Sequence, residues 1–485
     1  MSTIKKPSLL QSLAPVIILI GLLTVNVKIY GEDSSYGPNQ IALLFAATIG
    51  IAIGIRLNFN WENLLKGISK NITSTIPAII ILLLIGCLAG TWLISGVVPA
   101  MIYYGLEILN PKIFLFASCL ICAIVSVATG SSWSTVATVG IALLGIGKAF
   151  GIHEPIVAGA IISGAYFGDK MSPLSDTTNL APAMAGTDLI THIKYMALTT
   201  VPSMTITLLI FLIMGFFYTS DVEVTGVTNL QEIISANFNI TPWLFLVPIA
   251  VVVLIVIKVP AIPALFLGSV LGGIVAIIFQ SELIFSLSGE TNYIMASYKT
   301  IIDAMFGETL IVSEDSSAYK LLKSGGMSGM LNTVWLIVCA MIFGGVMDVT
   351  GMLKRITQSI IGLAKTTGSL IATTAASCFM LNLTASDQYL AIVVPGKMFA
   401  EEYKERGLHP KVLSRTLEDS GTVTSALIPW NTCGAYHAGV LGLATGEYAM
   451  YCFFNIISPI MTMIFGFLGI KIAKLVKNEE IQINE

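Results

Sequence analysis

The sequence predicts an all-α polytopic membrane protein built from two inverted repeats. Three observations support this fold class. Of the 485 residues, 55% are hydrophobic and only 11% are charged, and the mean hydropathy is +0.86, whereas a soluble domain carries about 25% charged residues. Apolar runs of about 20 residues, the length that crosses a bilayer, recur along the chain. Polar, proline-containing breaks interrupt both halves. We expect about five transmembrane helices and one re-entrant hairpin per repeat, with broken helices at mid-membrane.

Composition also limits the functional classes. A net charge of −3 without a basic field gives no support for nucleic-acid binding, so the lipid bilayer is the expected large partner. No Walker A motif and no nucleophile–base spacing are present, which predicts neither an enzyme nor a cofactor. Lys5 and Lys6 precede an apolar run that begins at Leu9. A signal peptide is the alternative, but no A-x-A-like cleavage site follows, which favours a first transmembrane helix.

The first repeat is expected over residues 1–217. Its spans are predicted at 9–27, 40–56, 74–96, 155–186 and 194–217, the fourth being broken. The segment 112–150 has two apolar arms around the polar tip Thr129–Thr135, and each arm is near the short limit for crossing. We interpret it as a re-entrant hairpin. The alternative is two short helices joined by a surface loop.

An extracytoplasmic linker is expected at 218–241, before a second repeat over 242–485. The second repeat follows the same plan, with spans predicted at 242–258, 261–279, 331–353, 410–444 and 449–473, the fourth again broken. Its hairpin is predicted at 368–401, with the polar tip Asn382–Gln388. The plan of the two halves is therefore the same.

A constant shift of 255 residues places the halves in register. It sets Ser131 on Ser386 at the hairpin tips and Thr177 on Thr432 at the broken helices. Repeats of this weak kind mark transporter folds, in which the binding site lies at the repeat interface. The two breaks are therefore expected to meet.

The distribution of charge predicts the topology. Five crossings per half is an odd number, so the repeats must be inverted. The linker 218–241 holds Asp221, Glu223 and Glu232 and no basic residue, while lysine and arginine gather in the loops on the opposite side. By the positive-inside rule we expect ten crossings, two hairpins and both termini in the cytoplasm.

The stretch Gly164–Asn179, GAYFGDKMSPLSDTTN, is the expected centre of the site. Pro173 lacks an N–H group and interrupts the helix, and the following residues are dense in side-chain oxygen. Broken polar backbone at membrane depth is tolerated only when it is buried in protein or lines a wet cavity. Secondary transporters build cation sites in this way.

Sodium prefers hard oxygen ligands, and proton coupling requires a buried carboxylate. The candidate cation- and proton-binding residues are those with such groups at the breaks and tips: Ser131, Ser132, Asp169, Asp176, Thr177, Thr178, Asn179, Ser386, Asp387, Glu418, Asp419, Asn431 and Thr432. Asp176 and Asn179 are the expected sodium ligands, and Asp176 is the carboxylate expected to bind sodium and protons in turn.

Structural alternatives remain for several of these residues. Asp169 and Lys170 are adjacent and would form a neutralised pair, and Arg415 lies one helical turn from Glu418. Lys397, inside the second hairpin, either snorkels or competes with sodium as a tethered cation.

The run GAYFGDKMSPLSDTTNLAPAMAGTDLITHIKYM, with TGSSWSTVATVG before it, resembles the NhaC family of sodium/proton antiporters. The resemblance covers nearly the whole chain. It implies inverted repeats with paired hairpins, site residues at Asp169, Asp176, Thr177 and Asn179, and exchange of sodium for protons across a bacterial cytoplasmic membrane. Members that exchange organic acids, such as malate for lactate, with sodium and protons are the alternative that it implies. Members of the wider superfamily are often dimers, so a homodimer is also expected.

Overall fold

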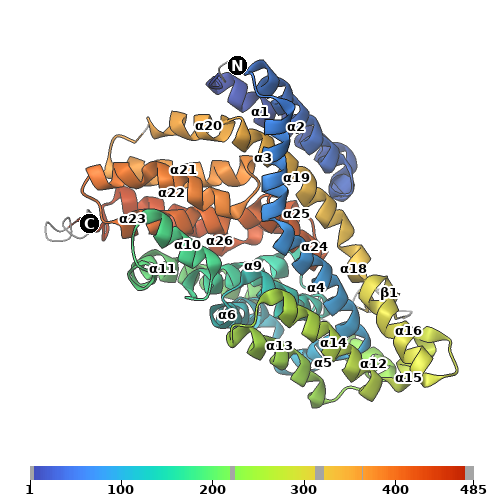
Figure 1. Cartoon of the computed structure of the whole chain (residues 1–485). Coiled ribbons are helices and arrows are strands. Elements are labelled where there is room, and N and C mark those ends of the chain that lie inside the picture. Colours follow the sequence, from blue (N-terminus) through green and yellow to red (C-terminus); the bar gives the residue numbers. More distant parts are fainter. Residues whose placement is uncertain (1–4, 219–223, 312–321, 363, 476–485) are drawn as a thin grey trace.

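The computed structural model describes residues 5–218, 224–311, 322–362 and 364–475 of the chain (Figure 1). These residues are almost entirely helical. The sheet found within them is one antiparallel pair, β1 (Thr309–Leu310) with β2 (Lys323–Ser324). In the described chain, seven helical stretches are long and apolar enough to cross a membrane, and two further helix pairs qualify as bent spans. The chain is therefore an all-α polytopic membrane protein, while the inversion of its repeats and the ten crossings stay predictions.

The spanning stretches agree with the apolar runs of the sequence. They are α1 (Leu9–Tyr30), α2 (Pro38–Arg56), α4 (Ile76–Ile94), α6 (Pro111–Thr129), α11 (Leu189–Tyr218), α14 (Ala261–Phe279), and α18 (Gly326–Gly329) continuing into α19 (Leu331–Val349). The bent pairs join α12 (Val224–Asn237) to η3 (Pro242–Phe245) and α13 (Leu246–Val256), and α25 (Thr445–Tyr448) with η6 (Ala449–Tyr451) to α26 (Phe453–Phe467). Helix α6 meets the length of a full span, although the sequence predicted a short hairpin arm.

The remaining helices are shorter or interrupted. In the first half they are η1 (Gly31–Ser35), α3 (Trp61–Ser74), α5 (Val97–Ile108), α7 (Ser132–Thr135), the π-helical turn η2 (Val136–Gly140), α8 (Ile141–Ala149), α9 (Glu154–Met171) and α10 (Asp176–Ala185). In the second half they are α15 (Ser281–Ser288), α16 (Tyr293–Phe306), α20 (Met352–Ile361), α21 (Thr367–Thr384), α22 (Gln388–Glu405), α23 (Pro410–Leu417), the π-helical turn η4 (Glu418–Thr422), η5 (Ser425–Leu427) and α24 (Thr432–Leu441).

Breaks occur at both expected places in each half. Gly130, with φ +71°, separates α6 from α7, and Ser172–Ser175 separate α9 from α10. In the second half, Ala385–Asp387 separate α21 from α22, and Ile428–Asn431 precede α24. Each new helix starts on a side-chain cap, which satisfies backbone N–H groups left free by the break.

Two glycines of the first break allow its helix to pack closely. A side-chain carbon on Gly164 or Gly168 would overlap the backbone carbonyl of Cys119 or Ala123 on α6. Small residues four apart let two membrane helices approach in this way. The close contact holds α9 directly against the first hairpin.

The register between the halves is not constant, which corrects the predicted shift. Left-handed Gly96 and Gly351 are 255 residues apart, but left-handed Gly130 and Ser386 are 256 apart. The same spacing of 256 recurs in the pairs Ser131 and Asp387, Pro173 and Pro429, Ser175 and Asn431, and Gly186 and Gly442. The change in spacing falls between Gly351 and Thr367, because Pro111 and Thr367, which begin α6 and α21, are already 256 residues apart. Asp176 therefore corresponds to Thr432 rather than to Asn431.

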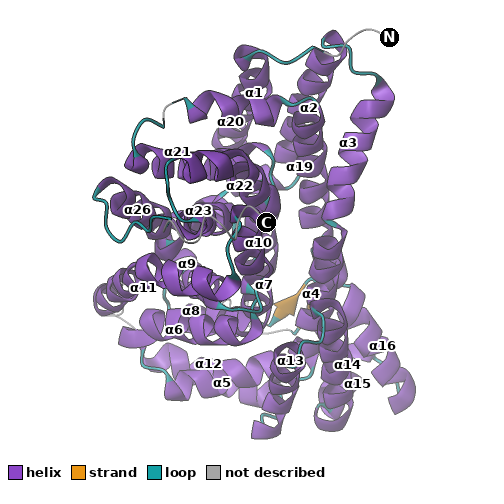
Figure 2. Ribbon diagram, turned by 60° about the vertical axis from the view of Figure 1, so that its left-hand side comes forward, coloured by secondary structure: helices purple, strands orange, loops and turns teal. Residues whose placement is uncertain are grey.

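Figures 1 and 2 show two groups of helices lying side by side. The scaffold group consists of α1–α4, α13, α14, α16 and α19, and runs along one edge of the molecule. The second group, called the break group, consists of α6–α11, α21–α24 and α26, and contains all four breaks. The breaks thus converge on the boundary between the groups.

Candidate functional site

A cavity of about 780 Å³ lies where the breaks converge. Its wall includes the first hairpin tip, the break before α10, the start of α22 and the start of α24. The scaffold group contributes the start of α4 and the turn between α13 and α14, which carries Lys258. Broken polar backbone from both halves thus lines a cavity.

With Asp387, Asp169 is one of the two buried carboxylates on this wall. It lies in the last turn of α9 and is 7% exposed. Its Oδ2 accepts a hydrogen bond of 3.1 Å from the backbone N–H of Ser132 and one of 2.6 Å from the Ser132 hydroxyl. Ser132 is the first residue of α7, where free N–H groups favour a negative charge. The first hairpin tip therefore fixes this carboxylate at the cavity.

Glu418 lies behind the cavity wall and is hydrogen-bonded to a residue that lines the cavity. Thr177 lines the cavity, and its Oγ1 donates a hydrogen bond of 3.0 Å to Oε1 of Glu418. Glu418 is fully buried, and its other oxygen, Oε2, has no hydrogen-bond partner among the described residues. A buried carboxylate with a free oxygen requires a proton or a cation to offset the cost of burial.

The second break is organised by neutral amides. Asn431 Nδ2 donates to Oδ1 of Asn382 at 3.0 Å, and Asn382 Nδ2 donates to the Gly421 carbonyl at 2.7 Å and to Thr424 Oγ1 at 2.9 Å. The backbone N–H of Thr432 also donates to the Ser386 carbonyl at 3.0 Å. These contacts join the second hairpin tip to α24 without any charged group.

The structure brings about half of the predicted site residues to the cavity wall. Those on the wall are Ser131, Ser132, Asp169, Asp176, Thr177, Asp387 and Thr432. Thr178, Ser386, Glu418, Asp419 and Asn431 are buried behind it. Asp387 acts as the cap of α22, accepting from the Leu390 N–H at 2.9 Å.

The two expected sodium ligands are not brought together. Asp176 is exposed on the cavity wall at the first position of α10. Asn179 is also exposed, but it does not line the cavity, and its Nδ2 donates to the carbonyls of Pro173 (3.0 Å) and Ser175 (2.7 Å). Asn179 therefore bridges the helix break, and the buried carboxylates of the wall are Asp169 and Asp387 rather than Asp176.

The charge pairs differ from those expected between sequence neighbours. Lys170 does not pair with Asp169; its ammonium group forms an ion pair with Asp419. Arg415 makes no hydrogen bond with any residue that the structure describes and packs instead over the ring of Tyr195, 4.7 Å from the centroid. Lys397 is exposed, whereas Lys170 is fully buried.

Sequence reasoning missed the partners of this ion pair, Thr199 on α11 and Ser458 on α26. The sequence of each helix contains a pattern that could have identified these partners. Buried hydroxyls recur at Thr199, Ser203 and Thr207 on α11, and Asn455, Ser458 and Thr462 form a similar stripe on α26. Polar side chains on one face of an apolar span mark the face that turns towards the protein interior.

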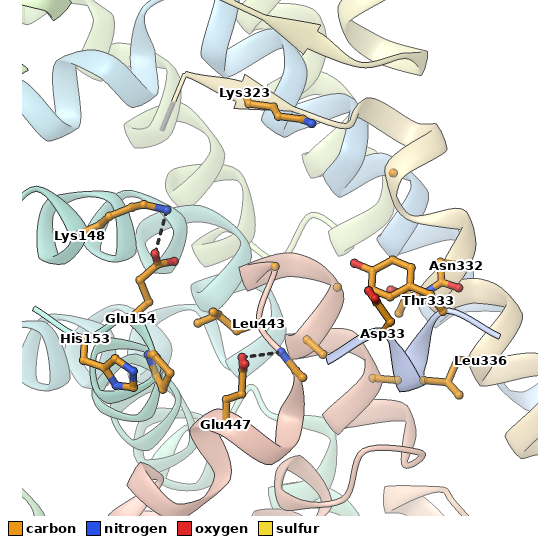
Figure 3. A pocket seen from close by; sticks show the side chains of 18 of the residues that line it. Asp33, Lys148, His153, Glu154, Lys323, Asn332, Thr333, Leu336, Leu443 and Glu447 are labelled. Atoms are coloured by element: carbon orange, nitrogen blue, oxygen red, sulfur yellow. Dashed lines mark hydrogen bonds and ion pairs between the residues drawn. The ribbon is translucent and has the colours of Figure 1, made fainter. Parts of the chain in front are cut away.

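A second cavity of about 1000 Å³ lies farther along α24 (Figure 3). Thr432 and Cys433 line the first cavity, whereas Ala435, Ala438 and Gly439 line the second. An ion pair of 2.9 Å between Lys148 and Glu154 lies on its wall, as Figure 3 shows. Helix α24 therefore passes from one cavity to the other.

An aromatic stack lies at the level where α24 changes cavity. The rings of Trp133 and Tyr436 are stacked with centroids 3.9 Å apart, and the Tyr436 hydroxyl donates to the Trp133 carbonyl at 2.9 Å. The stack joins the first hairpin to α24. Trp133 also lines the first cavity.

The sequence matches known proteins over most of its length. The profile of the "Na+/H+ antiporter family" matches residues 164–470. The Na(+)/H(+) antiporter NhaC of Alkalihalophilus pseudofirmus is 38% identical over 90% of this chain and 91% of its own. The Malate-2H(+)/Na(+)-lactate antiporter of Bacillus subtilis is 35% identical over 95% of both chains. The arginine/ornithine antiporter ArcD of Halobacterium salinarum is 34% identical over 96% of this chain and 93% of its own.

Proposed function

The chain belongs to the Na+/H+ antiporter family, and from this premise we propose that it exchanges sodium for protons at the cavity between the helix breaks. The observation that carries the proposal is Asp169, a buried carboxylate on the cavity wall that is fixed by the first hairpin tip. Glu418, linked to the wall through Thr177, is the second carboxylate of the site.

Exchange follows from competition for these carboxylates. An ionised carboxylate inside the membrane is costly unless a cation or a proton neutralises it. Sodium entering the cavity would meet Asp169 together with the hydroxyl oxygens of Ser131 and Thr177, which are hard ligands of the kind that sodium prefers. Because one carboxylate cannot hold both at once, binding of one releases the other.

The two cavities support alternating access. The site cavity opens beside Lys258, in a loop that the positive-inside rule assigns to the cytoplasm. The second cavity lies farther along α24, and its lining includes Asp33 and Glu447. The described arrangement then corresponds to an inward-open state of a bacterial inner-membrane protein whose termini lie in the cytoplasm.

The test uses purified protein in liposomes with a trapped pH dye. A sodium gradient drives proton movement in the wild type, and Asp169→Asn abolishes it while the protein stays inserted and monodisperse. Asp303→Asn, which removes an exposed carboxylate on α16, is the matched control and keeps the wild-type rate. Full exchange by Asp169→Asn would reject the role of this carboxylate.

A second candidate function is exchange of an organic acid with sodium and protons. The site cavity of about 780 Å³ favours it, because a bound water, similar in size to a small ion, occupies only about 30 Å³. The names of two relatives also include organic solutes, malate and lactate in one and arginine and ornithine in the other. Proton movement that appears only when malate or lactate is added to the same liposomes would make the acid the substrate.

A further inference from the structure

The Lys170 ammonium group lies in the interior of the break group and does not line the site cavity. Its side chain and that of Asp419 are both fully buried. Lys170 follows Asp169 directly, but successive residues of a helix point about 100° apart. Asp169 therefore faces the first hairpin tip, while Lys170 faces η4 and α26.

The groups around the ammonium are those of a small cation site. Asp419 Oδ1 and the Ser458 hydroxyl both accept from Lys170 Nζ, the latter at 2.8 Å. The second oxygen of Asp419 is held by the Thr199 hydroxyl at 2.7 Å. The ring of Phe454 lies 5.4 Å from Nζ and adds a cation–π contact. One carboxylate, the Ser458 hydroxyl and an aromatic face thus surround one positive charge, and the Thr199 hydroxyl holds the carboxylate in place.

Spare oxygen is available beside these groups. Asn455 is fully buried on α26, one turn from Ser458, and its Oδ1 has no hydrogen-bond partner among the described residues. An ammonium group donates hydrogen bonds in three directions and cannot use more than a few oxygens. A bare alkali cation binds oxygen from all sides and would use more of them.

We propose that Asp419, Thr199 and Ser458 form a second monovalent-cation site, which Lys170 fills with a tethered ammonium group. The inference rests on the proposed function and deepens it, because it sets how many sodium ions the chain binds. The built-in cation takes the place of one sodium ion. A chain without Lys170 should then bind one sodium ion more than the wild type does.

The experiment measures binding of radioactive sodium to purified full-length protein at saturation. Lys170→Ala is expected to bind one additional sodium ion per chain. Lys170→Ala combined with Asp419→Asn is expected to return to the wild-type number. Lys397→Ala, which removes an exposed lysine on α22, is the matched control and keeps the wild-type number. Methylammonium should compete for the added ion, whereas potassium should compete less.

A second variant and measurement keep the test decisive if Lys170→Ala does not fold. Lys170→Gln fills the volume of the side chain without its charge, and sodium should raise its melting temperature more than potassium does. An unchanged sodium count in Lys170→Ala would overturn the proposal. So would failure of both variants to fold in sodium buffer, or equal effects of sodium and potassium on Lys170→Gln, because the site would then be purely structural.

The outcomes separate the two proposals. A wild type that exchanges sodium for protons, with no additional sodium bound by Lys170→Ala, would reject only the second site. A wild type that drives no exchange would reject the proposed function, whatever the count in the variant.

Discussion

The two helix breaks of this protein are built on one plan but carry different chemistry. Each has a proline, Pro173 or Pro429, and a capped new helix that ends at a left-handed glycine. The contact between break and hairpin tip is also equivalent, because Asp169 and Ser132 correspond to Ser425 and Gln388 at the spacing of 256 residues. Asp169 accepts from Ser132 in the first half, and Ser425 donates to Gln388 Oε1 at 3.4 Å in the second. Only the first contact contains a charge.

The difference indicates separate roles for the two breaks. The first break presents carboxylates to the cavity, at Asp169 and Asp176. The second break has neutral residues at the equivalent positions and is held by the amides of Asn382 and Asn431. Hydrogen-bonded amides fix geometry without the cost of burying further charge. Of the two breaks, the first should therefore supply carboxylate ligands to the cation, and the second should hold the site in position.

Moving the charge between the breaks gives the largest expected effect. Asp169→Ser combined with Ser425→Asp keeps the number of carboxylates but places the charge on the second break. We expect exchange to fall at least about 100-fold, equivalent to about 2.7 kcal/mol, because a carboxylate at position 425 meets the Gln388 oxygen instead of N–H and hydroxyl donors. Sodium-driven proton flux in liposomes measures it. Recovery of wild-type flux would mean that the two breaks are interchangeable.

Loss of the amide network should reduce stability more than it reduces sodium affinity. Asn382→Ala removes two donated hydrogen bonds and the side-chain acceptor of Asn431, which keeps only the backbone carbonyl of residue 382. The free energy of unfolding should fall by about 2 kcal/mol, the cost of leaving one buried polar group without a hydrogen-bond partner. The melting temperature of the solubilised protein should fall well below that of Asn179→Ala, which disturbs only an exposed bridge. Equal melting temperatures for the two variants would contradict the structural role of the network.

Loss of the hydrogen bond between Thr177 and Glu418 should have the next largest effect. Thr177→Val keeps the shape of the side chain and removes the hydroxyl that donates to Glu418. A hydrogen bond to a charged group is worth about 1.5–3 kcal/mol, so sodium affinity should fall about tenfold or more. Equilibrium sodium binding measures the change, with Thr24→Val on α1 as an exposed control. An unchanged affinity would remove Glu418 from the site.

Asp176→Asn should have the smallest effect of the four. Its carboxylate is exposed on the cavity wall and lies at a helix start, where a negative charge is worth about 0.3–1 kcal/mol. We expect less than about a fivefold loss of exchange from a term of this size. Loss of all exchange, as the sequence alone led us to expect, would make Asp176 rather than Asp169 the shared carboxylate.

Local features of the sequence were enough to locate much of the architecture. The apolar run predicted at 261–279 coincides with α14, because a span depends only on its own hydropathy. The breaks were located by Pro173, by the polar tips and by capping residues, which act within a few positions of themselves. Short helices such as α3 and α20 were missed because neither is long enough to span.

What the sequence by itself determined is a helical membrane protein with four polar breaks, and the tertiary structure decided which charges face which partners. Lys170 and Asp419 are 249 positions apart, and Thr177 and Glu418 are 241 apart. Such pairs form only when helices from the two halves pack together. Sequence neighbours suggested Asp169 with Lys170 instead, but residues adjacent on a helix point in different directions. Burial of Asp169 and exposure of Asp176 were likewise set by the packing of α6 and the hairpin tip against α9, a contact no local pattern contains.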